Sequence, residues 1–250
     1  MHHRDLAEDG SGTTICPGQR QRIARSRYLV RRGDRPHAIH WIEKGWAARY
    51  KLLRDGRRHI THFYLPGDIC DLGWVSGRQV EQPVIALTPI ESVCVERSWI
   101  ERKLARSAGF SRKVAQQSLV DRVAQDEWLV SLGCKTAIEK IAHLFCELSL
   151  RLQGNGQASA ASAPCPLSQQ HLGDFTGMTP VHVCRTLREL RGRDLIELKR
   201  GRLRIPDFAR LARLCAFEGD YLRSDSGRGA TGPKSANDAA GLTFVAIASR

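Results

Sequence analysis

The sequence predicts an α+β protein in which an antiparallel β-roll is followed by a long helix and a winged helix-turn-helix. Three observations predict it. Short strand-like segments separated by turn signals occupy residues 27–97, a proline-free helical stretch begins near 98, and two short helices with a basic hairpin follow residue 167. The expected division is a flexible tail at 1–18, the β-roll at 19–97, the long helix at 98–132, the winged helix-turn-helix domain at 133–223 and a disordered tail at 224–250.

The β-roll is predicted from alternating side chains and strong turn signals. Trp46, Ala48, Tyr50 and Leu52 alternate with other residues, as in a half-buried strand. Asp55-Gly56 is a hairpin signal, because glycine allows the positive φ that a tight turn needs. Further turns are expected at Arg32-Gly33-Asp34 and Pro66-Gly67-Asp68.

The long helix is predicted from apolar residues that recur at helical spacing between Trp99 and Leu132. Its apolar side has two interpretations, packing on its own domain or a dimer seam, since no clean heptad repeat runs through it. A second helix is expected at Lys135–Leu152, followed by a loop at 154–166.

The charge balance favours a polyanionic partner, and nucleic acid is the commonest one. Lysine and arginine number 39 against 26 aspartates and glutamates, a formal net charge of +13. The most basic stretch, residues 20–60, has thirteen basic and three acidic side chains. It is either a solvated surface of the roll, which we prefer, or a contact for DNA or an acidic ligand.

Other classes of protein are disfavoured by what the sequence lacks. No apolar run approaches the roughly 20 residues that cross a bilayer, and the first ten residues have no secretion-signal core. We therefore expect a cytoplasmic protein without a membrane partner. The eight cysteines form no Cys-x-x-Cys pair, which argues against structural zinc and for free, mostly buried thiols.

Residues 168–190 have the pattern of a helix-turn-helix. Ser168 is a candidate N-cap for a first helix that ends near Phe175, and Gly177 can adopt positive φ in the turn. Thr179 can cap the second helix, with Pro180 at its first position. Gly173 is small enough to let the two helices cross closely.

The second helix has an exposed side suited to base edges, and the hairpin after it has a basic tip suited to phosphates. The candidate base-reading residues are Thr179, Val181, His182, Arg185 and Arg188. The candidate phosphate contacts are Ser168, Lys199, Arg200, Arg202 and Arg204. The hairpin is expected to turn at Arg200-Gly201.

Four segments, in this order along the chain, resemble the Crp/Fnr family of bacterial transcription regulators. They are GWAARYKLLRDGRRHITHFYLPGDICDLG at 45–73, ALTPIESVCV at 86–95, the helix-turn-helix at 168–190 and RIPDFARLARLCAFEGDYL at 204–222. The resemblance covers about residues 20–223. It implies a cyclic-nucleotide-binding-like sensor roll, a dimerisation helix and a DNA-binding domain. It also implies a homodimer on a near-palindromic site in double-stranded DNA, with RNA polymerase as a further partner.

The chain departs from the family at the places where cofactors would bind. Members that bind cyclic AMP have a Gly-Glu-Leu turn and then an Arg-Ser or Arg-Thr pair. This chain has Cys70-Asp71-Leu72 and Glu81-Gln82, and the Glu81 carboxylate would repel a phosphate. Oxygen-sensing members bind an iron–sulfur cluster through several N-terminal cysteines, whereas here Cys16 stands alone. We expect neither cofactor.

The recognition helix also departs from the family. Many members have Glu or Arg near its start, where this chain has Pro180 and Val181, while Arg185 is kept. The DNA sequence should therefore differ from the best-known sites, and Val181 is suited to a thymine methyl. Cys184 is either an inert small side chain, which we prefer, or a thiol made redox-sensitive by the adjacent cation and helix terminus.

A rival hypothesis is a metal- or small-ligand-dependent β-roll sensor or enzyme, with the C-terminal domain as a scaffold. It rests on the pairs His37/His40 and His59/His62. In strands, residues three apart point to opposite faces, so we prefer a solvated or hydrogen-bonding role for them and expect no metal. No Gly-x-Ser-x-Gly, phosphate-binding loop or His-Glu-x-x-His motif supports catalysis, and we expect a protein that is not an enzyme.

Overall fold

The computed structural model describes residues 14–16, 18–70, 72–156, 162–222 and 244–246. It divides into two compact units, and each is described here by itself. The first unit consists of residues 1–47, 64–117 and 240–250, and the second consists of residues 48–63 and 118–239. The second unit therefore combines one short stretch of the predicted roll with the C-terminal helices.

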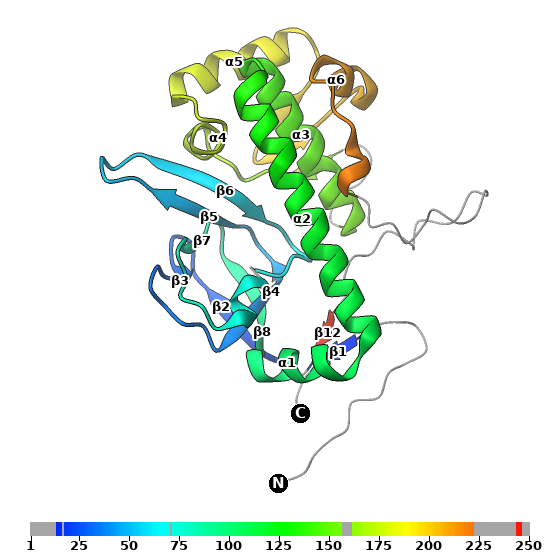
Figure 1. Cartoon of the computed structure of the whole chain (residues 1–250). Helices are drawn as coiled ribbons and strands as arrows, with labels where there is room; N and C mark the ends of the chain where they lie inside the picture. The colour runs from blue at the N-terminus through cyan, green and yellow to red at the C-terminus, as the bar shows by residue number, and fades with distance from the viewer. Residues whose placement is uncertain (1–13, 17, 71, 157–161, 223–243, 247–250) are drawn as a thin grey trace, which may run out of the picture. The chain divides into compact units, whose positions relative to one another are not determined.

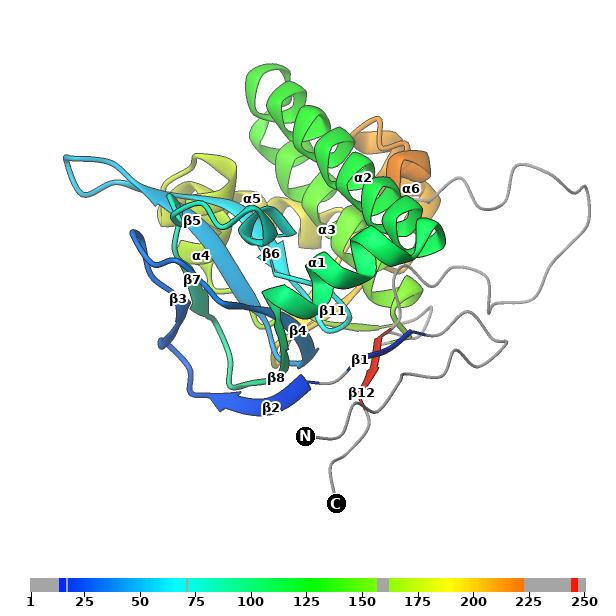
Figure 2. The same cartoon turned by 60° about the horizontal axis from the view of Figure 1, so that its bottom comes forward.

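The first unit is built on an antiparallel sheet with the strand order β2-β8-β4. Its strands are β2 (Gly18–Ile23), β4 (Ala38–Lys44) and β8 (Ile90–Glu96), which lie together in Figure 2. A second antiparallel pair joins β3 (Tyr28–Val30) to β7 (Val84–Ala86), and a short 3-10 helix, η1, spans Leu72–Ser76. The prediction of several short antiparallel strands is confirmed.

Apolar clusters pack on both faces of this sheet, because successive side chains of a strand point to opposite faces. On one face Ile39, Val93 and Val95 pack against Trp99 and Ile100. The other face belongs to a larger cluster whose members share almost complete burial: Ile23, Val30, Ile42, Ala47, Tyr64, Cys70, Trp74, Val80, Val84, Ala86 and Ile90. This cluster is the core of the first unit.

Two segments near the chain ends depart from the expected flexible tail at 1–18 and disordered tail at 224–250. Strand β1 (Thr14–Cys16) pairs in parallel with β12 (Phe244–Ala246), as Figure 2 shows. Both segments are rich in β-branched or aromatic residues, and each supplies the other's backbone partners. The remainder of the two tails, apart from Gly18 at the start of β2, lies outside the described residues.

The single long helix expected over 98–132 is two helices, α1 (Arg97–Arg106) and α2 (Ala108–Cys134). Ser107 separates them with an extended backbone, φ −126° and ψ 102°. Its hydroxyl oxygen accepts a hydrogen bond from the Phe110 amide at 3.2 Å, so Ser107 caps the start of α2. Serine competes well for free amides, and this local bond favours a break in an otherwise helical stretch.

The described residues of the second unit form a hairpin, a set of helices and a small wing sheet (Figure 1). The hairpin strands are β5 (Ala47–Leu52) and β6 (Arg58–Tyr64). The helices that follow α2 are α3 (Ala137–Gly154), α4 (Gln169–Thr176), α5 (Pro180–Gly192), α6 (Phe208–Leu214) and the 3-10 helix η2 (Gly219–Leu222). The wing strands are β9 (Ala163–Pro164), β10 (Glu197–Lys199) and β11 (Arg202–Arg204).

Local signals position these elements as the sequence predicts. Gly56 has φ 86° at the β5–β6 turn, Gly67 has φ 98°, and Gly33 has φ 89°. Helix α3 begins two residues after the expected Lys135, because Thr136 and Glu139 form a capping box. No helix within the described ranges is long and apolar enough to cross a membrane.

Candidate nucleic-acid interface

Helix α4 begins at a cap that the sequence predicts. The Ser168 hydroxyl oxygen accepts a hydrogen bond from the His171 amide at 3.2 Å. His171 Nδ1 in turn accepts from the Ser168 amide at 3.3 Å, so the two residues form a reciprocal capping box. Ser168 is exposed, and it marks the end of α4 where free amides suit an anion.

The turn between α4 and α5 depends on two glycines. Gly177 ends α4 with φ 72°, a left-handed conformation that glycine adopts without strain. Gly173 lies under the turn, and a Cβ atom there would approach the Met178 carbonyl oxygen to 2.5 Å. The Met178 amide donates to the Gly173 carbonyl at 3.0 Å. The predicted close crossing at Gly173 is confirmed.

Helix α5 begins as predicted and packs one side into the domain. The Thr179 hydroxyl oxygen accepts from the His182 amide at 3.2 Å, and Pro180 occupies the first turn. Val183, Leu187 and Leu190 are buried. Proline needs no amide partner at this position, so the sequence strongly specifies where α5 starts.

The opposite side of α5 is exposed and basic. We call this side the recognition surface, and it consists of Thr179, Val181, His182, Arg185 and Arg188. Val181 is 70% exposed, an unusual position for a β-branched apolar side chain. Among the described residues, no carboxylate forms an ion pair with Arg185 or Arg188. Their guanidinium groups are available for bidentate hydrogen bonds.

The wing carries the other predicted contacts. Arg200 and Gly201 both have positive φ, 50° and 70°, as a two-residue type I′ hairpin turn requires. Lys199 and Arg200 are exposed at its tip. Arg202 Nε donates to the Ser162 hydroxyl at 3.0 Å, and Arg204 forms an ion pair with Glu197. Among the described residues, Lys199 and Arg200 therefore form no ion pair, whereas Arg202 and Arg204 are already bonded to other residues.

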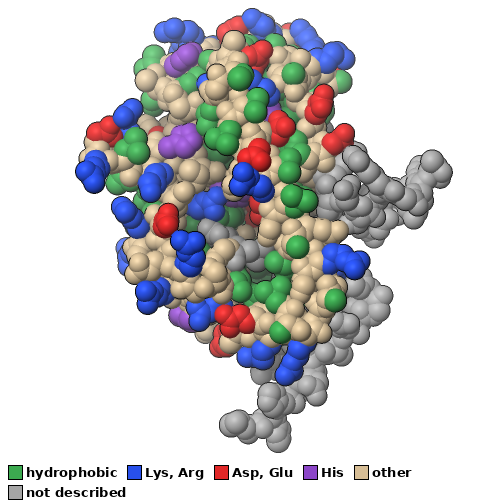
Figure 3. Space-filling view, viewed as in Figure 1, with side chains coloured by type: hydrophobic (Ala, Val, Ile, Leu, Met, Phe, Trp, Pro, Cys, Tyr) green, Lys and Arg blue, Asp and Glu red, His purple; other side chains and the backbone are tan. Residues whose placement is uncertain are grey.

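Figure 3 displays Lys and Arg side chains over the outer edge of α5 and at the tip of the β5–β6 hairpin. The hairpin tip contains Lys51, Arg54 and Arg57, all exposed. Arg57 Nε donates to the Asp55 carboxylate at 2.8 Å, which neutralises part of this charge.

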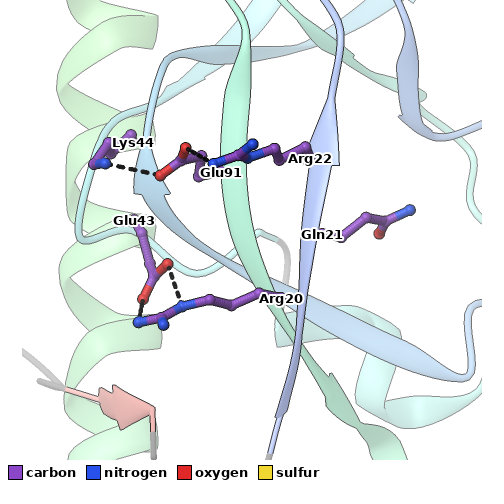
Figure 4. Close-up of a pocket in the computed structure, with 6 residues that line it drawn as sticks. All are labelled: Arg20, Gln21, Arg22, Glu43, Lys44 and Glu91. Atoms are coloured by element: carbon purple, nitrogen blue, oxygen red, sulfur yellow. Dashed lines mark hydrogen bonds and ion pairs between the residues drawn. The ribbon is translucent and has the colours of Figure 1, made fainter. Parts of the chain in front are cut away.

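The rest of the basic segment 20–58 contains a second charged surface with a different character. Figure 4 shows it around a cavity of about 640 Å³ on the β2-β8-β4 sheet. We call it the paired surface, and its lining residues are Arg20, Gln21, Arg22, Glu43, Lys44 and Glu91. Glu43 pairs with Arg20 at 3.1 Å, and Glu91 pairs with Lys44 at 2.8 Å and Arg22 at 3.3 Å. Every cation here has a carboxylate partner, which supports the solvated interpretation.

The positions that correspond to the cyclic-AMP motif differ in their exposure. Glu81 is an exposed carboxylate in the loop before β7, and Cys70 is completely buried in the core of the first unit. Asp71 lies outside the described residues. A buried phosphate needs a cation or several donors, and Glu81 supplies neither.

The histidines of the two pairs differ in position and burial. His37 is exposed ahead of β4, while His40 is buried within it, and His59 and His62 both lie on β6. No three His, Cys, Asp or Glu side chains of the described ranges gather as a metal site would require. Burial lowers the pKa of His40 to about 4, with the nearby His37 as a second cause, so His40 is neutral at pH 7.

The seven cysteines from Cys70 to Cys215 are free thiols. Cys184 lies on α5, half-buried, next to the exposed Arg185. Cys165 is buried beside the wing, and burial raises the pKa of its thiol to about 11.

Sequence reasoning missed one residue of this region, Asp174. It lies on α4 with 8% of its surface exposed, between the buried Gly173 and Phe175. A buried carboxylate needs partners, so an acid on the buried side of a short helix was the available signal. Its partner Arg58 lies 116 residues away, and no local pattern identifies it.

The chain contains an antiparallel β-roll unit and a winged helix-turn-helix with an exposed basic recognition helix, which together define a class of DNA-binding regulators. Residues 20–107 match the cyclic nucleotide-binding domain family, and residues 139–214 match the Crp-like helix-turn-helix domain family. The chain belongs to the Crp/Fnr family of DNA-binding transcription regulators.

Individual relatives support this assignment. The transcriptional activator protein FnrL of Cereibacter sphaeroides is 28% identical over 183 residues, which cover 72% of this chain and 73% of FnrL. The nitrogen fixation regulation protein FixK of Azorhizobium caulinodans is 30% identical over 164 residues, covering 66% of this chain and 65% of FixK. The structure of FixK2 from Bradyrhizobium japonicum is similar with a TM-score of 0.72 and 25% identity, over 80% of this chain and 98% of FixK2. The rival enzyme or sensor hypothesis is not favoured.

Proposed function

We propose that the protein is a symmetric homodimer that reads a near-palindromic DNA site with α5 and acts by binding alone, without catalysis. The observation that carries the proposal is the recognition surface, an exposed helix side with two arginines that no described carboxylate neutralises. A helix of this kind fits the major groove, where base pairs present distinct patterns of donors and acceptors.

Each residue of the recognition surface suits a particular contact. Arg185 and Arg188 can donate two hydrogen bonds to guanine, and Val181 can contact a thymine methyl. His182 can donate or accept. The Thr179 hydroxyl oxygen already accepts from the His182 amide, so its hydroxyl hydrogen is the part that can reach DNA.

Phosphate contacts come from the cap of α4 and from the wing. Ser168 lies where α4 presents its amides, and Lys199 and Arg200 are exposed at the wing tip. The Arg204–Glu197 pair is about half-exposed on both sides, and exposed ion pairs contribute little, so a phosphate can replace Glu197. Arg202 can exchange its bond to Ser162 in the same way.

The dimer contact is proposed on α2. Seven large hydrophobic side chains of the described residues are exposed, and three of them, Leu119, Leu129 and Val130, lie on this helix. Leu119 and Val130 are eleven residues apart, about three helical turns, so they share one side of α2. A second copy of α2 would cover them, and a two-fold dimer then presents two α5 helices to a palindrome.

Signal and partners are also proposals. The poor fit of Glu81 to a phosphate supports activity without a cyclic nucleotide, and the single cysteine among the first 69 residues, Cys16, supports activity without an iron–sulfur cluster. Contact with RNA polymerase in the cytoplasm is consistent with FnrL, whose name describes a transcriptional activator.

The proposal is tested by mapping bound sites across the genome and measuring the mass of the purified protein. We expect a dimer and an enriched motif with two-fold symmetry. A monomer that binds random and genomic duplexes equally would refute it. Submicromolar binding of cyclic AMP or cyclic GMP in calorimetry would refute the ligand-independent part alone.

A further inference from the structure

Strand β6 contacts the first helix of the helix-turn-helix through a partly buried ion pair. Arg58 Nε donates to Asp174 Oδ2 at 2.7 Å, and its Nη2 donates to the same oxygen. Gln170 Nε2 donates to the other carboxylate oxygen at 2.6 Å. Asp174 is 8% exposed, so these donors replace the water that would otherwise solvate its carboxylate oxygens.

Arg58 is itself held in place. Its side chain is 31% exposed, and its guanidinium carbon lies 5.5 Å from the centre of the Tyr50 ring on β5. The cation therefore lies between an aromatic ring and a carboxylate, which fixes its geometry. Figure 1 shows β5 and β6 passing beside α4, as these contacts require.

A second contact joins the base of β6 to the same helix. The Phe63 ring stacks on Phe175 of α4, with centres 4.7 Å apart, and Trp128 of α2 packs its edge against Phe175 at 4.4 Å. Arg151 of α3 donates to the Phe63 carbonyl at 2.8 Å. Strand β6 thus contacts α4 at two adjacent residues, Asp174 and Phe175.

A shift of α4 would be transmitted to α5. The Met178 amide donates to the Gly173 carbonyl, and Gly173 is in close contact with the turn backbone, so the two helices have little freedom relative to each other. Whatever holds α4 therefore sets the direction of the recognition surface.

We propose that Arg58 is a positioning residue for DNA reading, which orients the helix-turn-helix by binding Asp174 and does not touch DNA. This inference rests on the proposed function of α5. It assigns to the β5–β6 hairpin, a part of the predicted roll, a role in the specificity of the DNA-binding domain. The guanidinium of Arg58 is committed to Asp174 by two hydrogen bonds, whereas the adjacent Arg57 is exposed and bonds within the turn to Asp55.

The test compares Arg58→Gln with the matched control Arg57→Gln in the full-length protein. Affinity is measured for a mapped genomic site and for a random duplex over a range of salt concentrations. In Arg58→Gln we expect specific affinity to fall about tenfold, within the range typical of coupling between sites. The affinity for the random duplex should not change. The slope of the logarithm of the association constant (log K) against the logarithm of the salt concentration (log salt) should also not change. Arg57→Gln should leave the ratio of specific to random affinity unchanged.

Two results would overturn the proposal. One is a slope that falls by about 0.9 in Arg58→Gln with an unchanged specificity ratio, which would mean that Arg58 neutralises a phosphate. The other comes from a double-mutant cycle that combines Arg58→Gln with Asp174→Asn. If the two residues act through each other, the double variant should lose about the same tenfold as each single variant, because the contact is lost only once. An additive loss of about a hundredfold would mean that they act separately.

Hydrogen exchange separates this inference from the proposed function. In the DNA-free protein, amides of α4 should exchange faster in Arg58→Gln than in the wild type or in Arg57→Gln. Unchanged exchange in α4 would overturn the positioning role even if DNA binding is specific. If the wild type lacks specific DNA binding, the proposed function fails, while the exchange result still decides whether Arg58 holds α4.

Discussion

The recognition surface and the paired surface both carry basic side chains, but among the described residues only the cations of the paired surface have carboxylate partners. On the paired surface, Glu91 of β8 lies directly opposite Arg22 of β2 and Lys44 of β4. Neighbouring strands therefore neutralise each other's charges. On the recognition surface the arginines extend from one exposed side of α5, where no strand in the described part of the chain supplies a carboxylate.

The difference shows that the local density of basic residues does not by itself say which cations remain without a carboxylate partner. Residues 20–60 contain thirteen of the 39 basic side chains, and the paired surface accounts for three of them. What matters is whether a cation has a carboxylate partner in the fold. Strand register decides that, because cross-strand neighbours lie within reach of each other.

The largest expected effect is on the sheet that carries the paired surface, through the buried His40. Burial lowers its pKa from 6.5 to about 4, so below pH 6.5 the unfolded chain binds a proton that the folded chain excludes. The free energy of unfolding should therefore fall by about 3 kcal/mol as the pH falls from 6.5 to 4.

This acid effect is measured by urea unfolding at several pH values. The variant His40→Asn should lose that part of the pH dependence, while His37→Asn, at an exposed position, should keep it. Parallel pH profiles for the wild type and His40→Asn would contradict the assignment.

The second prediction concerns Arg185 on the recognition surface. Arg185→Ala should reduce affinity for the mapped site by about 1–3 kcal/mol, since a bidentate contact to a base is lost. Affinity for random duplexes should change much less, and Arg20→Ala on the paired surface should change neither. Equal losses on both duplexes, measured by fluorescence anisotropy, would argue against base reading by Arg185.

A smaller effect is expected at the wing. Lys199→Ala and Arg200→Ala should weaken binding to all sequences alike, because phosphate contacts carry no sequence information. The slope of log K against log salt should fall by about 0.9 for each residue. A changed sequence preference would place these side chains in a groove instead.

The smallest effect tests the pairing itself. Glu43→Gln releases Arg20 from an exposed ion pair, which should change the free energy of unfolding very little because water screens such pairs. Random-duplex affinity at low salt should rise slightly, and specific affinity should not change. A marked gain in specific affinity would show that the paired surface lies close to bound DNA.

The features that the sequence predicts correctly are local. The caps at Ser168 and Thr179, the left-handed Gly177 and the type I′ turn at Arg200-Gly201 each depend on a few consecutive residues. Caps and turns formed by consecutive residues can adopt few alternative conformations, so the start of α5 follows from the sequence.

The features that escape prediction depend on contacts between distant residues or on competition within a helix. Arg58 meets Asp174 across 116 residues, and β1 pairs with β12 from opposite ends of the chain. Ser107 interrupts a helical stretch, where its side chain bonds to the Phe110 amide. The spacing of apolar residues gives no sign of this bond. The pairing of basic residues with carboxylates also escapes prediction, because it depends on strand register.

The crowding at Gly173 has a genetic consequence. The Cβ of any other residue at this position would lie 2.5 Å from the Met178 carbonyl oxygen. Substitutions should therefore distort the helix-turn-helix but leave α2 folded. If subunits associate through α2 as proposed, a defective subunit would still dimerise with a normal one. The resulting dimer would have only one functional recognition helix. Alleles altered at this codon should therefore be dominant over the wild type, a phenotype that simple loss of the protein would not produce.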